Sequence, residues 1–312
     1  MLPFLLKPYL KRVLWGGSSI AAFKGIDIPF DHVGESWEVS AMEGCGSVVA
    51  NGPYAGTDFA GLCASMGSEL LGKRIYDRYG GEFPILIKYI DAVGDLSVQV
   101  HPGDDIAYSR HGCRGKSEMW YIVGAEPGSR LSLGFSTEID ADEFESRVKD
   151  GTISDVLATF ATHPGDVFYI PAGRVHAVGG GNFLVEVQLA SDITYRIHDY
   201  NRRDKDGRLR ELHIAEARDA IDYSVQSDYR SYPDGERLIS SPFFSVDKIN
   251  LSDDDSRTVC SDVFSVVMCI DGCIKAECEG HALEVPRGHT LFVPASTKVN
   301  LSGRSTLLLV VP

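Results

Sequence analysis

The sequence has no apolar run that approaches the ~20 residues of a membrane-spanning helix, and it has no excess of positive charge. Its 30 Lys and Arg residues against 44 Asp and Glu residues give a formal net charge of −14. Nucleic-acid backbones are bound by basic stripes, and none is visible here. We therefore expect neither a membrane nor a nucleic acid as a partner. A small anionic substrate would need a local cluster of Lys and Arg.

A disulfide framework is also missing. The seven cysteines are scattered at positions 45, 63, 113, 260, 269, 273 and 278. An odd count without regular spacing is typical of reduced thiols, and we expect a cytoplasmic protein. The last three flank a predicted hairpin turn but lack the close C-x-x-C pairs of zinc sites, so we interpret them as packing residues.

Helical patterns are few, and strand patterns dominate the 312 residues. Short runs such as "FPILIKYI" and "SEMWYIV" are rich in β-branched and aromatic residues and are bounded by Gly, Pro or Asp. Helices are predicted only within 59–72, 140–160 and 209–224. The chain is long enough for one large or two modest domains. The pattern favours a mainly β protein, a sandwich or barrel with a few helical insertions.

An internal repeat indicates two units of related design. Residues 164–176, "PGDVFYIPAGRVH", and residues 287–299, "RGHTLFVPASTKV", align with a shift of 123 positions. Both follow the pattern G-x-x-hydrophobic-aromatic-aliphatic-Pro-Ala, which describes a turn, a buried strand and a proline that ends it. The repeat predicts two tandem β-barrels. The alternative is a chance similarity of two β-hairpins.

The stretch "LSVQVHPGDD" raises a chemical question. Its alternation gives a strand with one aliphatic face and with Gln99 and His101 side by side on the other. Glu118 interrupts the apolar strand "EMWYIV", and His176 ends the first repeat. Taken singly, each of these residues has a plainer explanation as a core or solvent-facing side chain. Together they offer the N and O ligands that suit Zn²⁺, arranged as a β-barrel builds a site at its mouth.

Four motifs in this order carry a family resemblance: "LSVQVHPGDD", "GKSEMWYI", "IPAGRVHAVGGG" and "TYRIHDYNR". Together they closely resemble the type I mannose-6-phosphate isomerases (phosphomannose isomerases) of the cupin superfamily, in particular the shorter bacterial form. The upstream stretches "VLWGG", "GESWEVSA" and "FPILIKYIDA" are similar to that family as well. The resemblance covers about residues 8 to 224 and continues weakly to the C-terminus.

The resemblance implies two tandem cupin-type jelly-roll barrels and one zinc ion per chain. By motif position, it implies metal ligands at Gln99, His101, Glu118 and His176, and an active-site arginine at Arg196. We expect a metal-bearing barrel at 1–205 with helices near 59–72 and 140–160, a helical connection at 206–234, and a degenerate second barrel without metal at 235–312. The loop "DDIAYSRHGCRGKSE" departs from any strict pattern, which leaves loop contacts open.

The second barrel is expected to lack ligands because Val299 stands where the repeat would require the counterpart of His176. A barrel interior without ligands should be filled by side chains. The residues that we expect to fill it are Val263, Val266, Met268, Leu291 and Val293.

The implied reaction is zinc-dependent interconversion of mannose 6-phosphate and fructose 6-phosphate through a cis-enediol or enediolate, so the partner is a small sugar phosphate. Arg196 can stabilise negative charge but is a poor base. The base is left open between a zinc-bound water, Lys88, Lys116 and a histidine. Lys88 in "LIKYI" also fits a snorkelling surface lysine, whereas Lys116 shares a strand face with Glu118.

The phosphate anchor cannot be assigned from the sequence. Arg202, Arg203 and Lys205 form a basic cluster that a solvated loop explains equally well. Two other functions stay open: a non-catalytic sugar-phosphate-binding cupin that acts as a regulator, and another metal cupin such as an iron-dependent oxygenase. The complete ligand quartet together with Arg196 favours the isomerase.

Overall fold

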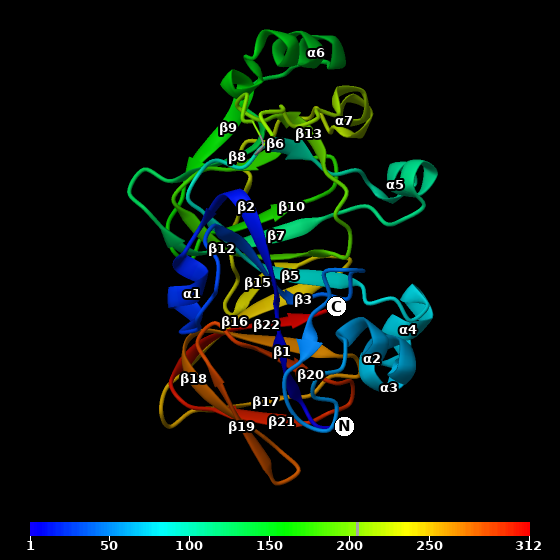
Figure 1. The fold of residues 1–312 in the computed structure, drawn as a ribbon, viewed down its shortest axis with the longest axis vertical. Helices are drawn as coiled ribbons and strands as arrows, with labels where there is room; N and C mark the ends of the chain where they lie inside the picture. Colours follow the sequence, from blue (N-terminus) through cyan, green and yellow to red (C-terminus); the bar gives the residue numbers. More distant parts are fainter. Residues whose placement is uncertain (204–205) are drawn as a thin grey trace.

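The computed structural model describes residues 1–203 and 206–312, and it stacks three β-sheets as layers (Figure 1). The central, seven-stranded sheet has the order β14 (Arg230–Ser231), β10 (Val167–Ile170), β7 (Glu118–Ala125), β12 (Asn182–Leu189), β5 (Ile85–Ala92), β2 (Tyr9–Gly17) and β3 (Val33–Val39). A five-stranded sheet on one side has the order β13 (Tyr195–His198), β6 (Val98–Val100), β11 (His176–Val178), β8 (Arg130–Phe135) and β9 (Leu157–Ala161).

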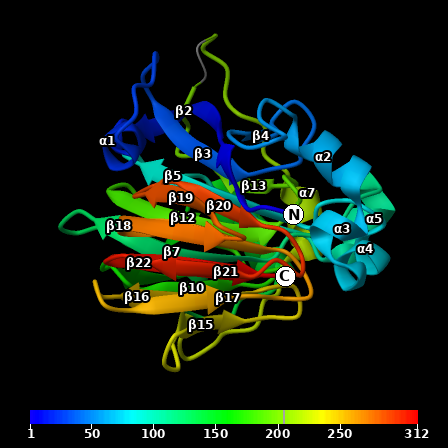
Figure 2. The same ribbon diagram turned by 90° about the horizontal axis from the view of Figure 1, so that it is seen from below.

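A ten-stranded sheet forms the other outer layer (Figure 2). Its main order is β15 (Arg237–Ser240), β16 (Ser245–Leu251), β22 (Ser305–Val311), β18 (Ser265–Cys278), β20 (Thr290–Val293), β1 (Phe4–Lys7) and β4 (Val48–Val49). Off this path, β17 (Ser256–Val259), β19 (His281–Pro286) and β21 (Val299–Ser302) pair with one another or with β18. Because β1 pairs with β20, the first strand of the chain joins the sheet that the last strands build.

The helices lie outside the sheets. They are α1 (Ser19–Lys24), α2 (Phe59–Met66), α3 (Ser68–Leu71), α4 (Lys73–Tyr79), α5 (Asp104–His111), α6 (Ala141–Asp150), the 3-10 turn η1 (Ile153–Val156) and α7 (Ile214–Ala220). Figures 1 and 2 place α2, α3 and α4 together at one side of the stack and α1 at the opposite side. None of the described helices has the length and hydropathy of a membrane span.

The predicted fold class is confirmed: the protein is mainly β, with jelly-roll-like packing of stacked sheets and a few helical insertions. Helices α6 and η1 lie in the predicted region 140–160, and strand β9 begins at Leu157 within it. The unit boundaries at 205 and 234 stay a prediction. Lys205 of the basic cluster lies outside the described residues.

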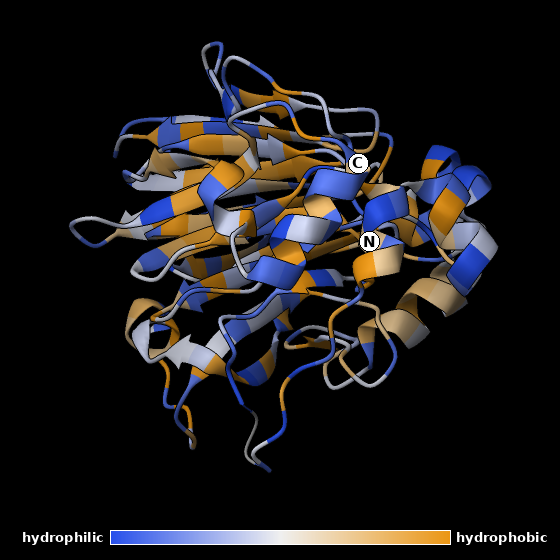
Figure 3. Cartoon of the chain, turned by 90° about the horizontal axis from the view of Figure 1, so that it is seen from above, coloured by the Kyte–Doolittle hydropathy of each residue, from blue (hydrophilic) through white to orange (hydrophobic). Residues whose placement is uncertain are grey.

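Strand β5 shows why the strands of the central sheet have nearly continuous apolar sequences. Every residue of "ILIKYIDA" is buried, since Ile87 and Tyr89 face the ten-stranded sheet while Ile90 faces the five-stranded one. A strand covered on both faces loses the usual polar alternation. Lys88 is 7% exposed, so the interpretation of Lys88 as a snorkelling surface lysine is wrong. Figure 3 shows hydrophobic and hydrophilic residues alternating along many of the other strands.

The set of side chains that fills the C-terminal unit agrees only in part with the predicted one. Leu291 and Val293 lie in its internal cluster, as expected. Val263, Val266 and Met268 instead belong to the cluster shared with the central sheet. On β18 the inward residues are Val267 and Cys269, one position out of phase with the prediction. Both faces of β18 are apolar, so alternation alone did not decide which face points inward.

A buried ion pair joins the N-terminal elements to the C-terminal sheet. Lys24 Nζ at the end of α1 lies 2.7 and 2.8 Å from the two carboxylate oxygens of Glu38 and also donates to the carbonyl of Gly288. Glu38 accepts further hydrogen bonds from Ser36 Oγ at 2.6 Å and from Thr290 Oγ1 at 3.1 Å. Both charges are therefore fully bonded, as burial requires.

We expect Glu38→Ala to destabilise the fold strongly, because it leaves the Lys24 ammonium buried without a counter-charge. Removing one partner of a buried pair costs about 3–5 kcal/mol. The free energy of urea unfolding measures this. Asp77→Ala is the matched control, since it removes a carboxylate from an exposed pair with Lys73, and it should leave stability nearly unchanged. Equal losses in the two variants would contradict this role of the buried pair.

Candidate active site and metal centre

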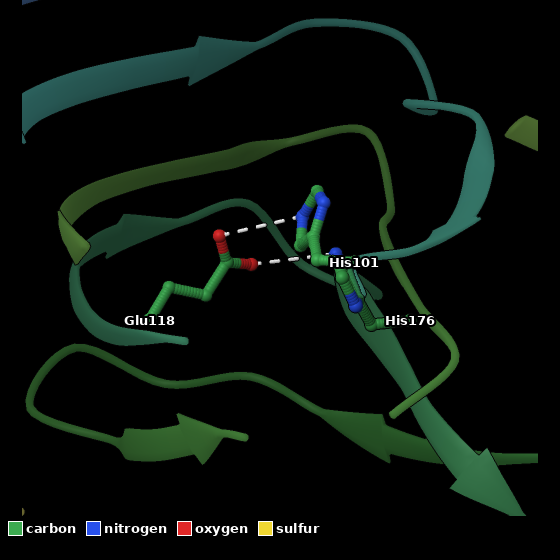
Figure 4. A group of neighbouring side chains, drawn as sticks. All are labelled: His101, Glu118 and His176. Atoms are coloured by element: carbon green, nitrogen blue, oxygen red, sulfur yellow. Dashed lines mark ion pairs between the residues drawn. The ribbon is translucent and has the colours of Figure 1, made fainter. Parts of the chain in front are cut away.

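Strand register brings the predicted metal ligands together between the five-stranded and seven-stranded sheets. His176 on β11 pairs directly with Gln99 on β6. His101 follows β6, and Glu118 is the first residue of β7. Figure 4 shows His101, Glu118 and His176 pointing toward one another from separate strands or strand ends.

The three side chains form a tight buried cluster. His101 Nε2 lies 3.6 Å from Glu118 Oε2, and His176 Nε2 lies 3.3 Å from Glu118 Oε1. One ligand atom from each residue lies within 4.8 Å of the others. Gln99 Nε2 is 3.2 Å from His176 Nε2, so the fourth predicted ligand borders the same point. The arrangement offers two imidazole nitrogens, a carboxylate and an amide to a single centre.

Hydrogen bonds behind the histidines select their tautomers. His101 Nδ1 is 2.7 Å from the carbonyl oxygen of Ile193, and His176 Nδ1 is 2.9 Å from that of Arg174. Because a carbonyl only accepts, each Nδ1 carries the proton and each Nε2 presents a lone pair to the cluster. Burial lowers the pKa of His176 to about 4 and that of His101 well below its ordinary value. Both rings are therefore neutral at pH 7.

The residues fit a bound metal ion. Within the described residues, His101 Nε2 and Glu118 Oε1 are buried without a hydrogen-bond partner, whereas Glu118 Oε2 lies 2.8 Å from Lys116 Nζ. Leaving such groups unsatisfied costs about 1–3 kcal/mol each, more when they are charged. A cation at their common point would satisfy both. For Gln99 to join through its oxygen, Oε1 and Nε2 must exchange places, because Oε1 now accepts from Ser97 Oγ at 3.4 Å.

Buried charges of alternating sign surround this cluster. Lys116 Nζ lies 2.8 Å from Glu118 Oε2 and 3.8 Å from Glu186 Oε1. Lys88 Nζ lies 3.0 Å from Glu186 Oε1 and 3.6 Å from Glu35 Oε2. These five residues form a ladder from Glu118 to Glu35, which we call the charge ladder.

Strand register builds the ladder. Lys88 on β5 lies directly opposite Glu186 on β12 and Trp37 on β3, and Glu186 lies opposite Trp120 on β7. Trp120 Nε1 donates to Glu186 Oε2 at 3.0 Å, and Lys88 Nζ is 4.9 Å from the centre of the Trp37 ring. The two tryptophans thus flank a buried ion pair on one face of the sheet.

The ladder sets the protonation of its members. Burial and the Glu186 charge raise the pKa of Glu118 to about 7, against the opposing effect of Lys116. Burial would also raise the pKa of Glu186, but Lys116 and Lys88 hold it at about 2. Burial by itself would lower the pKa of Lys88, but the charges of Glu186 and Glu35 keep that pKa above its ordinary value. Lys88 therefore stays protonated at neutral pH.

Sequence reasoning did not identify Glu186 or Glu35. Glu186 had a usable signal, since it interrupts the apolar strand "FLVEVQL" as Glu118 interrupts "EMWYIV". Glu35 had a weaker signal in the sequence, because "GESWEV" contains two glutamates that point to opposite faces. Glu35 faces the cavity, whereas Glu38 faces the C-terminal sheet.

Arg196 on β13 lies beside the cluster, paired in register with Gln99. Its backbone N–H donates to His213 Nδ1 at 3.1 Å, and its carbonyl accepts from the N–H of His213 at 2.8 Å. Its Nη1 donates to the carbonyl of Glu211 at 2.8 Å. The segment just before α7 therefore holds Arg196 in place at three points.

A cavity of about 340 Å³ adjoins the cluster. It is lined by Lys11, Val13, Trp15, Glu35, Trp37, Lys88, Ile90, Leu96, Ser97, Gln99, Lys116, Glu186, Asp192, Thr194, Arg196 and Arg210. The structure thus gathers Lys88, Lys116 and Arg196 around one space. Arg202 and Arg203 of the basic cluster are not among the lining residues; they bind Asp199 and the carbonyl of Gly207.

A jelly-roll-like β fold with two histidines and a glutamate converging in its interior defines a cupin-type protein with a candidate metal site. Residues 4–119 match the family model "Phosphomannose isomerase type I, catalytic domain", and residues 236–312 match "Mannose-6-phosphate isomerase, cupin domain".

Known proteins support the same assignment. Mannose-6-phosphate isomerase ManA of Bacillus subtilis is 37% identical over 258 residues, 80% of each chain. Mannose-6-phosphate isomerase of Streptococcus mutans is 33% identical, covering 95% of this chain and 93% of that one. The crystal structure of the Bacillus subtilis mannose 6-phosphate isomerase superposes with a TM-score of 0.90 at 30% identity over 100% of both chains. The chain belongs to the type I mannose-6-phosphate isomerase family.

Metal binding to the metal-free protein should depend on pH through Glu118. Below about pH 7 its carboxyl is protonated, and a metal must displace that proton. The affinity should therefore fall by about tenfold per pH unit from 7 toward 5 and level off above 7. Titration calorimetry with Zn²⁺ in buffers of different ionisation enthalpy measures affinity and proton release together. Glu118→Gln should bind more weakly and without this slope; a slope that persists in the variant would contradict the assignment.

Proposed function

We propose that the chain interconverts mannose 6-phosphate and fructose 6-phosphate in this cavity, through a cis-enediol or enediolate, with zinc held by Gln99, His101, Glu118 and His176. The observation that carries the proposal is the buried cluster with its unpartnered lone pairs, next to an arginine-lined cavity, in a chain of this family. A small sugar phosphate is the proposed partner, and the cytoplasm is the proposed location.

Zinc is proposed because neutral imidazole nitrogens with a carboxylate and an amide oxygen are ligands that it accepts. When bound, it would supply Lewis-acid charge for oxygens that become negative during the reaction. The chain prepares the site for it. The carbonyls of Ile193 and Arg174 orient the two imidazoles, and burial keeps both neutral. Lys116 compensates the Glu118 carboxylate at 2.8 Å.

The reaction moves one proton between two carbons and one between two oxygens. The C2 hydrogen of the open-chain aldose leaves as a proton, a proton is added at C1, and a hydroxyl proton passes from O2 to O1. Negative charge develops on these oxygens in between. We assign Arg196 to stabilise it, because a guanidinium stays protonated and directs several donors in a fixed plane. Its Nε has no partner among the described residues, and Glu211 holds Nη1.

The proton carrier is proposed among the groups that line the cavity. Lys88 is unsuited to act as a base, because Glu186 and Glu35 keep it protonated. We assign it the role of neutralising the ladder. Lys116 lines the cavity and contacts Glu118 of the ligand set. Lys116 also pairs with Glu118 and Glu186, but of the two lysines it is the one in contact with the ligand set. Among the four candidate bases, we favour Lys116, on position alone, as the group that holds and returns the proton.

Arg196→Lys should lose most of kcat while retaining the metal. Lysine keeps one charge but loses the planar fork, and the loss of one transition-state donor typically lowers kcat about 100- to 1000-fold. A coupled assay of mannose 6-phosphate conversion and elemental analysis of the same sample check both halves. Near-normal kcat would place Arg196 outside the chemistry.

Chelation should abolish turnover, and elemental analysis should find about one tightly held zinc per chain, as one four-ligand site requires. His176→Ala should lower the zinc content sharply. Full turnover in metal-free protein would refute the metal role, and two zinc ions per chain would refute a metal-free C-terminal unit. Tight binding of sugar phosphate without turnover would favour the regulator.

A further inference from the structure

A loop joins the two proposed metal ligands His101 and Glu118. It contains helix α5 and projects on the same side of the stack as α4 (Figures 1 and 2). Of the eight residues of α5, only Ala107 is buried, and none of them lines the cavity, although the structure describes them all. The loop therefore acts on the cavity through its base, where the chain leaves the site after His101 and returns to it at Lys116.

The base of the loop is closed by close backbone packing. The N–H of Lys116 donates to the carbonyl oxygen of Pro102 at 3.1 Å. Gly115 is so near the outgoing chain that a Cβ there would lie 2.6 Å from the Pro102 oxygen and 2.6 Å from the carbonyl carbon of Gly103. Glycine permits this approach because it has no Cβ. We call this contact between residues 102–104 and 115–116 the neck.

One side chain closes the neck. Asp104 Oδ1 accepts a hydrogen bond from the N–H of Gly115 at 2.8 Å, and no other side chain in the described part of the chain bonds across the neck. Asp105, the next residue in the first turn of α5, has no hydrogen bond or ion pair within the described residues. Both carboxylates lie near the start of the same helix, so the bond to Gly115 is what distinguishes Asp104.

The position of Lys116 depends on the neck. Lys116 lies before the start of β7, and its N–H is bonded to Pro102 rather than to a neighbouring strand. Its Nζ reaches the metal end of the cavity, 2.8 Å from Glu118 Oε2 and 3.8 Å from Glu186 Oε1, and the side chain is 5% exposed. A shift of the backbone at the neck would therefore move this ammonium group relative to the ligand set.

We propose that Asp104 is a positioning residue for the isomerase reaction: its carboxylate closes the neck and thereby fixes the place of Lys116 at the metal end of the cavity. The assignment rests on the proposed function and on Lys116 as the proton carrier. A proton is transferred only over a short and well-aligned distance, and a displacement of about 1 Å can cost about 100-fold in rate. Because Lys116 acts in the chemical step, its displacement should lower kcat and leave KM nearly unchanged.

Asp104→Ala tests the assignment in the full, metal-loaded chain. The kcat for mannose 6-phosphate should fall by roughly 10- to 100-fold. The KM and the zinc content should change little, because the two imidazoles keep the carbonyls of Ile193 and Arg174 as partners. Asp104→Asn keeps an acceptor oxygen and should recover most of kcat. Asp105→Ala is the matched control, since it removes the neighbouring carboxylate from the same turn, and it should leave kcat unchanged.

Amide hydrogen exchange reports on the neck without any turnover. Loss of the hydrogen bond in Asp104→Ala should speed exchange of the Gly115 N–H by about tenfold. In Asp104→Asn and Asp105→Ala this N–H should exchange as in the unmodified chain. Gly115→Ala opens the same neck from the returning chain, because its Cβ would meet backbone atoms, and it should lower kcat in the same way.

The two measurements separate the possible failures. Turnover by the unmodified chain tests the isomerase, and amide exchange tests the neck. Unchanged exchange of Gly115 in Asp104→Ala would overturn the closure of the neck by Asp104. Faster exchange with a normal kcat would overturn the positioning of Lys116. An Asp104→Asn variant as slow as Asp104→Ala would overturn it too, since the loss would then come from the charge rather than from the hydrogen bond.

Discussion

Burial of alternating charges on one face of the central sheet is the constraint on which the site depends. Three carboxylates and two ammonium groups lie between the packed sheets, from Glu118 to Glu35. Each charge would be costly alone and is tolerated because a neighbour of opposite sign lies within 4 Å. Removal of one member would leave its neighbours uncompensated. The ladder therefore ties the register of β3, β5, β7 and β12 to the protonation states of the site.

The layered arrangement explains how such a ladder can exist. The central sheet is covered on both faces, so its strands must be apolar except where a charge has a partner directly opposite. Lys88 and Glu186 lie directly opposite each other on β5 and β12, so each charge has a partner. Trp37 on β3 and Trp120 on β7 lie on the two outer sides of this pair. The other face of the same sheet packs against the C-terminal sheet, and the Lys24–Glu38 pair joins the two units there. One sheet thus serves the site and the fold together.

The sequence pattern alone identifies a site residue where a polar side chain interrupts the apolar alternation of a strand. Gln99 and His101 share a face because side chains two residues apart always do, and Glu118 stood out as an acid in an apolar strand. The structure brings these residues together with His176. Glu186 carried the same signal and was not identified. For Lys88 the sequence leaves a candidate base and a surface lysine both open, because a lone charge in a strand usually lies at the surface and its partner Glu186 is 98 positions away in the chain.

The sequence by itself determined the strand-rich fold, the repeat and the four residues that we propose as metal ligands, because these follow from alternation within a strand and from motifs a few residues long. The tertiary structure alone decided which of two apolar faces points inward on β18, which lysines are buried, and which carboxylates pair with them. Those outcomes depend on what lies opposite each strand. Lys88 and Glu186 pair only when segments 98 positions apart in the chain pack together.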